Sequence, residues 1–77
     1  MDRNTVAAKI LGIIKNNTGI VVENEGSTFA EGGIDSLDAV EVFMTIEEEF
    51  DIKIPDADAG NLKTVGELID YVAAKVA

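Results

Sequence analysis

Only one stretch of this chain has the composition of a β-strand, and this constrains the fold more than any other feature. The stretch is Ile20-Val21-Val22, three consecutive β-branched residues. An extended segment needs a second one to pair its backbone N–H and C=O groups, and the sequence offers no second run of this kind. We therefore expect residues 20–22 to begin a loop that places apolar side chains on a helical core, and we predict an all-α fold.

Apolar residues at three- and four-residue spacing indicate where the helices lie. The predicted helices are residues 4–17, 36–50, 55–59 (a short turn that begins at the only proline) and 65–74. Seventy-seven residues suffice for one domain. The prediction is a single domain over residues 1–77: a small bundle of three main helices and one short helix, with a long first loop.

The helix ends carry recognisable signals. Asn4 or Thr5 is expected to cap the first helix, and Gly19 to end it in the left-handed conformation. Thr64 and Glu67 form the pattern of a capping box at the start of the last helix.

A glycine pair, Gly32-Gly33, precedes the second helix. Asp35 is placed to accept hydrogen bonds from the free N–H groups that open this helix, and Asp38 adds a carboxylate to its first turn. Ser36 then lies in the first turn with its hydroxyl toward water. By itself this pattern indicates only a capped helix start.

The composition excludes several kinds of chemistry. The chain has no cysteine and no histidine, so thiol nucleophiles, disulfides, imidazole catalysis and the usual zinc ligands are absent, and we expect no metal site. No apolar run approaches the length of a membrane span, and the N-terminus lacks the pattern of a signal peptide. We expect a cytoplasmic protein without membrane insertion.

The net charge of −9 is confined to one segment. Residues 31–58 hold ten acidic residues and a single base, Lys53, whereas acids and bases balance elsewhere. Nucleic acid is disfavoured as a partner because its phosphates would be repelled. A basic patch on another protein is favoured, and the alternative is an acidic surface that only maintains solubility.

The second helix has two apolar faces instead of one. The broader stripe should face the core and consists of Ala39, Val42, Phe43, Ile46 and Phe50. Leu37, Val40 and Met44 fall on another side, among carboxylates. This second strip is either a docking face for a partner or, for Val40 and Met44, a surface covered by another segment of the chain.

Taken together, these residues resemble the acyl carrier proteins. The tetrapeptide Asp35-Ser36-Leu37-Asp38 matches the modification site of that family. Other matching motifs are Val40-Glu41, Met44, Glu47-Glu48-Glu49-Phe50-Asp51, Ile54-Pro55-Asp56, Thr64-Val65 and Ile69-Asp70-Tyr71-Val72. The likeness runs from about Phe29 to Val72, and the combination is far more specific than the tetrapeptide alone.

The resemblance implies that Ser36 is the attachment point of 4′-phosphopantetheine, which a phosphopantetheinyl transferase transfers from coenzyme A. The chain would then be a carrier and not an enzyme, holding acyl groups as thioesters for fatty acid or related acyl biosynthesis. The absence of histidine and cysteine is consistent with this role, because the transferase supplies the base and the phosphopantetheine arm supplies the thiol. A phosphodiester on Ser36 would lie near the positive end of the helix dipole.

The resemblance also implies two groups of binding residues. Contacts with basic patches on the transferase and on acyl-processing enzymes would come from Asp35, Leu37, Asp38, Val40, Glu41, Met44, Glu47 and Glu48. An acyl chain would be sheltered by Phe29, Val42, Ile46, Ile54, Ala59, Leu62, Leu68 and Ile69, all of which also suit plain core packing. We expect the carrier to be a monomer.

The loop before Ser36 departs from the family pattern. Residues 29–34 are one residue shorter than usual and lack an Asp-Leu pair, so the apolar contact of this loop is expected from Ile34. This departure suggests a carrier dedicated to a specialised pathway.

Two other functions compete with the carrier. Asp56-Ala57-Asp58 begins like a calcium loop, but Gly60 and Asn61 break the required spacing. An unmodified acidic helical adaptor would need only the second apolar face of the helix 36–50.

Overall fold

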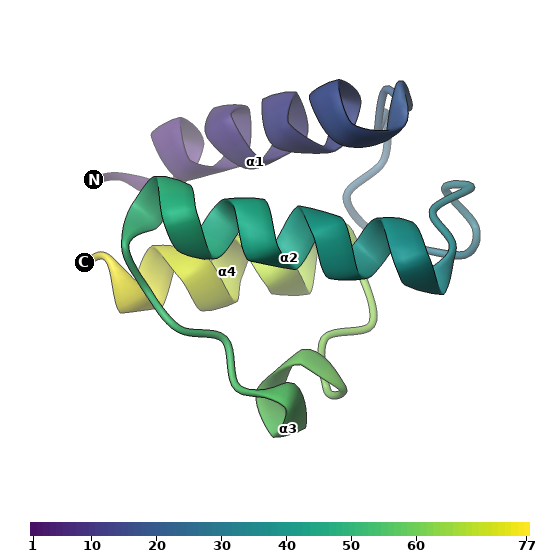
Figure 1. Cartoon of the computed structure of the whole chain (residues 1–77). Coiled ribbons are helices and arrows are strands. Elements are labelled where there is room, and N and C mark those ends of the chain that lie inside the picture. The colour runs from purple at the N-terminus through teal and green to yellow at the C-terminus, as the bar shows by residue number, and fades with distance from the viewer.

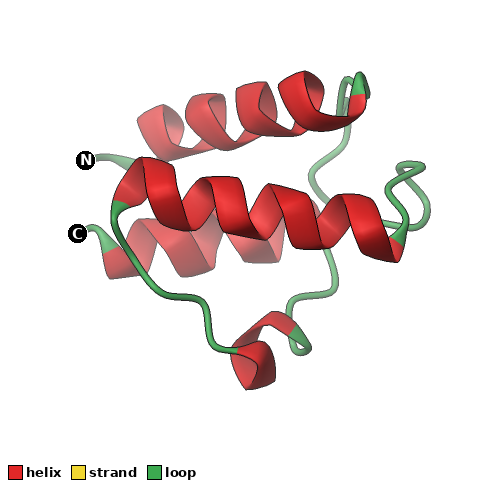
Figure 2. Cartoon of the chain, in the orientation of Figure 1, coloured by secondary structure: helices red, strands yellow, loops and turns green.

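The computed structural model describes residues 1–77 and contains four helices and no sheet (Figure 1, Figure 2). The helices are α1 (Arg3–Thr18), α2 (Ser36–Phe50), α3 (Asp56–Ala59) and α4 (Val65–Lys75). The all-α prediction is confirmed, and residues 20–22 are loop. Ile20 and Val22 pack on the core as predicted, whereas Val21 is exposed.

The core lies between the three long helices. α1 packs against both α2 and α4, while α3 lies apart on the connection between α2 and α4 (Figure 1). Thirteen apolar residues are buried and no polar residue is: Val6, Ala7, Ile10, Ile13, Ile14, Ile34, Val42, Ile46, Ile54, Val65, Leu68, Ile69 and Val72. None of the helices combines the length and apolar character that crossing a membrane requires.

The start of α1 corrects the predicted cap. Asp2 is the N-cap, and its carboxylate accepts a hydrogen bond from the Thr5 N–H at 2.8 Å. This hydrogen bond lowers the pKa of Asp2. Asn4 and Thr5 lie inside the helix instead, because Asp2 is as good a cap and lengthens the helix by two or three residues. Gly19 ends the helix at φ 77°, as predicted.

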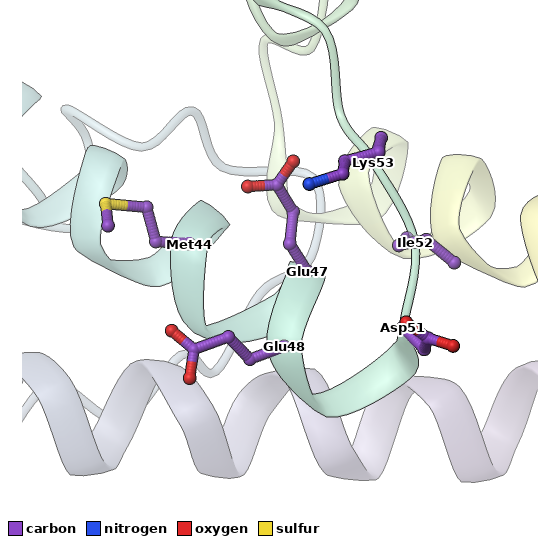
Figure 3. A pocket seen from close by; sticks show the side chains of 6 residues that line it. All are labelled: Met44, Glu47, Glu48, Asp51, Ile52 and Lys53. Atoms are coloured by element: carbon purple, nitrogen blue, oxygen red, sulfur yellow. The ribbon is translucent and has the colours of Figure 1, made fainter.

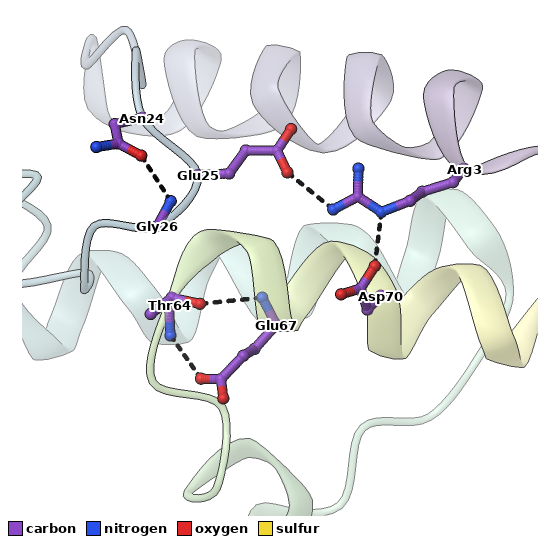
Figure 4. Close-up of polar contacts among 7 residues, drawn as sticks. All are labelled: Arg3, Asn24, Glu25, Gly26, Thr64, Glu67 and Asp70. Carbon is purple, nitrogen blue, oxygen red and sulfur yellow. Dashed lines mark hydrogen bonds and ion pairs between the residues drawn. The ribbon is translucent and has the colours of Figure 1, made fainter.

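The capping box that opens α4 is confirmed. The Glu67 N–H donates to the Thr64 hydroxyl at 3.1 Å, and the Glu67 carboxylate accepts from the Thr64 N–H at 3.0 Å (Figure 4). The same carboxylate oxygen accepts from the Lys63 N–H at 2.8 Å. These bonds fix the chain entering α4.

Arg3, the only arginine, joins three segments. Its guanidinium contacts Asp70 of α4 at 2.6 Å and Glu25 of the first loop at 2.8 Å (Figure 4). Hydrogen bonds with these carboxylates raise the pKa of Arg3. The loop is also held by its backbone, since Glu25 accepts from the Gly66 N–H at 2.8 Å. The first loop is therefore fixed against α4.

One side-chain hydrogen bond ties α3 to α4. The Tyr71 hydroxyl donates to the Asp58 carboxylate at 2.6 Å. This bond, with a smaller contribution from burial, raises the pKa of Tyr71 to about 12. Asp58, the third residue of the calcium-like sequence, is therefore engaged with a tyrosine.

This contact makes stability at alkaline pH depend on Tyr71. The folded pKa lies above the ordinary value of 10.0, so the stabilisation is complete below pH 10 and disappears as the pH rises through about 12. We expect the melting temperature of the wild type to fall more steeply over that range than that of Tyr71→Phe. Thermal melts at stepped pH measure the difference, and parallel curves would contradict the prediction.

Candidate functional site

The loop before Ser36 is a compact hydrogen-bonded turn. The N–H groups of Gly32, Gly33 and Ile34 donate to Thr28, Ala30 and Phe29 at 3.0, 3.0 and 2.9 Å. Gly33 adopts φ 88°, a conformation that favours glycine. Ile34 is 3% exposed and supplies the apolar contact that was predicted for it. The shortened loop therefore still anchors the start of α2.

A second capping motif inside this loop was missed by sequence analysis. Thr28 and Glu31 exchange reciprocal hydrogen bonds: the Thr28 N–H donates to the Glu31 carboxylate at 2.8 Å, and the Glu31 N–H donates to the Thr28 hydroxyl at 3.1 Å. The spacing Thr-x-x-Glu is the capping-box signature and could have revealed it. Glu31 is thus bound to its own loop.

Asp35 and Ser36 have separate roles at the start of α2. The Asp35 carboxylate accepts from the Asp38 N–H at 2.9 Å, as expected for the cap. Ser36 is the first helical residue and is exposed. Because Asp35 does the capping, the Ser36 hydroxyl is left at the surface, where another molecule can reach it.

One side of α2 presents apolar side chains to solvent. Leu37, Val40 and Met44 are 78%, 54% and 55% exposed. This exposure rules out the alternative that another segment of the chain covers Val40 and Met44. Exposed Glu41 and Glu48 and half-buried Asp38 lie on the same helix. We call these six residues the outer face of α2.

Glu47, which was predicted to contact partners, has an internal role. Its carboxylate accepts from the Ile54 N–H at 2.8 Å, and its carbonyl accepts from Ile52 at 3.1 Å and from Asp51, the left-handed C-cap residue at φ 54°. Figure 3 shows the Glu47 side chain directed toward the segment that carries Lys53. Ile54 lies seven positions after Glu47 in the chain, so no local motif signals this bond.

Three hollows adjoin α2, and two of them are not lined by α1. The first, of about 560 Å³, lies at its C-terminal end and is lined by Met44, Glu47, Glu48, Asp51, Ile52 and Lys53 (Figure 3). The second, of about 460 Å³, lies between α2 and α3, and we call it the α2–α3 cleft. Its lining residues are Phe29, Ser36, Ala39, Val40, Phe43, Met44, Glu47, Ile54, Asp56, Ala59, Gly60 and Leu62. Ser36 therefore borders a mostly apolar cleft.

The eight residues expected to shelter an acyl chain fall into two groups. Four of them line the α2–α3 cleft: Phe29, Ile54, Ala59 and Leu62. The other four do not border the cleft and are at most 2% exposed: Val42, Ile46, Leu68 and Ile69. The prediction did not include Phe43, which lines the cleft and faces Phe29.

The acidic segment has few counter-charges within the fold. Of the three ion pairs, only Lys9–Glu49, at 3.8 Å, involves a carboxylate of residues 31–58. Nowhere do three or more potential metal-ligating side chains gather. The carboxylates of this segment are therefore left to repel one another.

This repulsion predicts a salt-dependent stability. We expect the melting temperature to rise by several degrees as sodium chloride is increased, because added ions screen like charges at the surface. Millimolar magnesium should act in the same direction at lower concentration. Differential scanning calorimetry measures the effect, and a melting temperature independent of salt would show that the repulsion is unimportant.

Comparisons with known proteins identify the class of the chain. Residues 8–72 match the model of the family described as "Phosphopantetheine attachment site". The acyl carrier protein of Syntrophobacter fumaroxidans is 41% identical over 76 residues, which cover 95% of this chain and 94% of that protein. The mitochondrial acyl carrier protein of Saccharomyces cerevisiae is 37% identical, and the match covers 96% of this chain and 65% of that protein.

A solved structure agrees with this class. The crystal structure of an acyl carrier protein from Thermotoga maritima has a TM-score of 0.85 and 35% identity, with 99% of this chain and 92% of that chain covered. The chain therefore belongs to the acyl carrier protein family, whose covalent group is 4′-phosphopantetheine. The resemblance seen in the sequence is confirmed, and the unmodified adaptor is not favoured.

Proposed function

We propose that Ser36 is the residue that carries 4′-phosphopantetheine. The observation that supports this most strongly is an exposed serine at the start of α2, released from capping by Asp35 and bordering the α2–α3 cleft. On attachment, the Ser36 Oγ–phosphorus bond forms while the adenosine bisphosphate half of coenzyme A leaves. The attached group supplies a thiol for thioester formation.

The surroundings of Ser36 fit such a group. The N-terminus of α2 offers partial positive charge to a phosphodiester, although the carboxylates of Asp35 and Asp38 offset part of it. No histidine or cysteine exists to activate Ser36. We infer that this chain is a covalent carrier and that the chemistry belongs to its partner enzymes.

The outer face of α2 is proposed as the docking surface for the transferase and the acyl-processing enzymes. Exposed Leu37, Val40 and Met44 provide apolar contact, and the carboxylates beside them attract basic residues. Asp35 and Glu47 contribute to the negative potential while their carboxylates also bind backbone N–H groups. The pathway is fatty acid or related acyl biosynthesis, and the shortened loop supports a specialised carrier.

Intact-mass spectrometry tests the function. The protein is incubated with coenzyme A, magnesium and a broad-specificity phosphopantetheinyl transferase. We expect a single gain of one phosphopantetheinyl group. An unchanged mass, with folding verified by circular dichroism, would contradict the proposal and return the unmodified adaptor to consideration.

The docking surface is tested by a pair of charge reversals. Glu41→Lys places a base on the outer face of α2, whereas Glu23→Lys makes the same change at an exposed loop position. We expect Glu41→Lys to slow transfer at limiting protein concentration by about tenfold at low salt, because steering is lost, and Glu23→Lys to leave the rate unchanged. Equal rates for the two variants would contradict the assignment of the docking surface.

A further inference from the structure

Two phenylalanine rings line the α2–α3 cleft. Phe29 comes from the first loop and Phe43 from α2, and their centroids are 5.9 Å apart with the planes at 84°. This edge-to-face arrangement is a favourable aromatic contact. Both residues are half-buried, and both line the cleft on one side while packing on the core on the other.

Phe29 is held in place by the backbone around it. The Phe29 carbonyl accepts from the Ile34 N–H at 2.9 Å. Two residues earlier, the Ser27 carbonyl accepts from the Val65 N–H at 3.3 Å. Thr28 also pairs with Thr64 in an isolated antiparallel β-bridge. These bonds fix the backbone at Phe29 to Ile34 and, through its two preceding residues, to the start of α4.

The two rings adjoin two apolar regions. One is the cleft of about 460 Å³, which Ser36 also borders. The other is the buried core, against which both rings pack and which includes Val42 and Ile46 of α2 and Leu68 and Ile69 of α4, at most 2% exposed. The core holds no buried polar group, so space opened beside it by removing a ring would favour methylene groups over water.

We propose that Phe43, together with Phe29, limits the length of the acyl chain that the cleft can shelter. This inference rests on the proposed carrier function. A short or medium straight-chain acyl group lies against Phe43, Ile54, Ala59 and Leu62 and is removed from water. The distal methylene groups of a longer chain meet the ring pair and remain in solvent, so they add no stabilisation.

A series of acyl forms tests the proposal. The transferase is supplied with butyryl-, octanoyl- or palmitoyl-coenzyme A, each product is verified by intact mass, and its melting temperature is compared with that of the same variant carrying the unacylated arm. The proteins are the wild type, Phe43→Ala and Phe43→Leu. Phe50→Ala is the matched control, because Phe50 is a half-buried phenylalanine of α2 that does not line the cleft.

In the wild type, we expect the octanoyl form to have a higher melting temperature than the butyryl form. The palmitoyl form should melt no higher than the octanoyl form. In Phe43→Ala, palmitoyl should exceed octanoyl by about 4 °C or more, because the opened wall admits the distal methylene groups. Phe50→Ala should keep the wild-type pattern. If Phe43→Ala does not fold, Phe43→Leu, which opens the wall partly, should show the same trend.

Identical chain-length patterns in the wild type and the folded Phe43 variants would overturn the proposal while leaving the carrier function intact. A wild type in which palmitoyl already stabilises more than octanoyl would also overturn it. Failure of any acyl group to attach to the wild type would overturn the carrier function itself, and this inference with it.

Discussion

Ser36→Ala is expected to abolish attachment of 4′-phosphopantetheine completely while the fold survives. The side chain is exposed and takes no part in capping α2, so removing one hydroxyl should change the free energy of unfolding by less than about 0.5 kcal/mol. The reacting oxygen, by contrast, is lost entirely. Intact mass after incubation with coenzyme A and the transferase measures the first effect, and urea denaturation measures the second.

Ser27→Ala is the matched control, because Ser27 is the only other serine of the chain. It lies in the first loop, and its carbonyl, which accepts from Val65, is retained in the variant. This variant should gain mass like the wild type. Attachment that persists in Ser36→Ala, or disappears in Ser27→Ala, would contradict the assignment of the site.

Ile46→Ala is expected to have the largest effect on stability. Ile46 is fully buried in the C-terminal half of α2, and truncating such a side chain costs about 2–5 kcal/mol through lost burial and the cavity left behind. A domain of this size has a total stability of roughly 4–12 kcal/mol, so the variant should lie close to unfolding. The free energy of unfolding from urea titrations gives the direct comparison.

Val40→Ala provides the control for Ile46→Ala. Val40 is a β-branched residue on the same helix but is 54% exposed. Its truncation should change the free energy of unfolding by less than about 0.5 kcal/mol. A similar loss in both variants would show that the two sides of α2 do not differ as the structure indicates.

The strongest sequence signals were those made by local chemistry. Asp35 as cap, Gly19 as helix end and the Thr64–Glu67 box depend on groups three or four residues apart, and all three were predicted. Where several residues qualify, such signals are ambiguous. Asp2 caps α1 although Asn4 and Thr5 have equally suitable side chains.

The cleft was harder to predict because it depends on distant segments. Helical periodicity showed that Val42, Phe43 and Ile46 face inward. Periodicity could not show that Phe43 borders a cleft, whereas Val42 and Ile46 lie in the closed core. This difference depends on where the first loop and α3 lie. The bond from Ile54 to Glu47 was missed for the same reason.

Modification of Ser36 is tested most directly by the intact mass of this protein purified from the cell in which it naturally occurs, followed by peptide mapping. We expect the protein to carry one phosphopantetheinyl group, free or acylated, on the peptide containing Ser36. A protein that is folded and active in its cell yet consistently unmodified, or modified at another residue, would contradict the assignment of Ser36 as the attachment site.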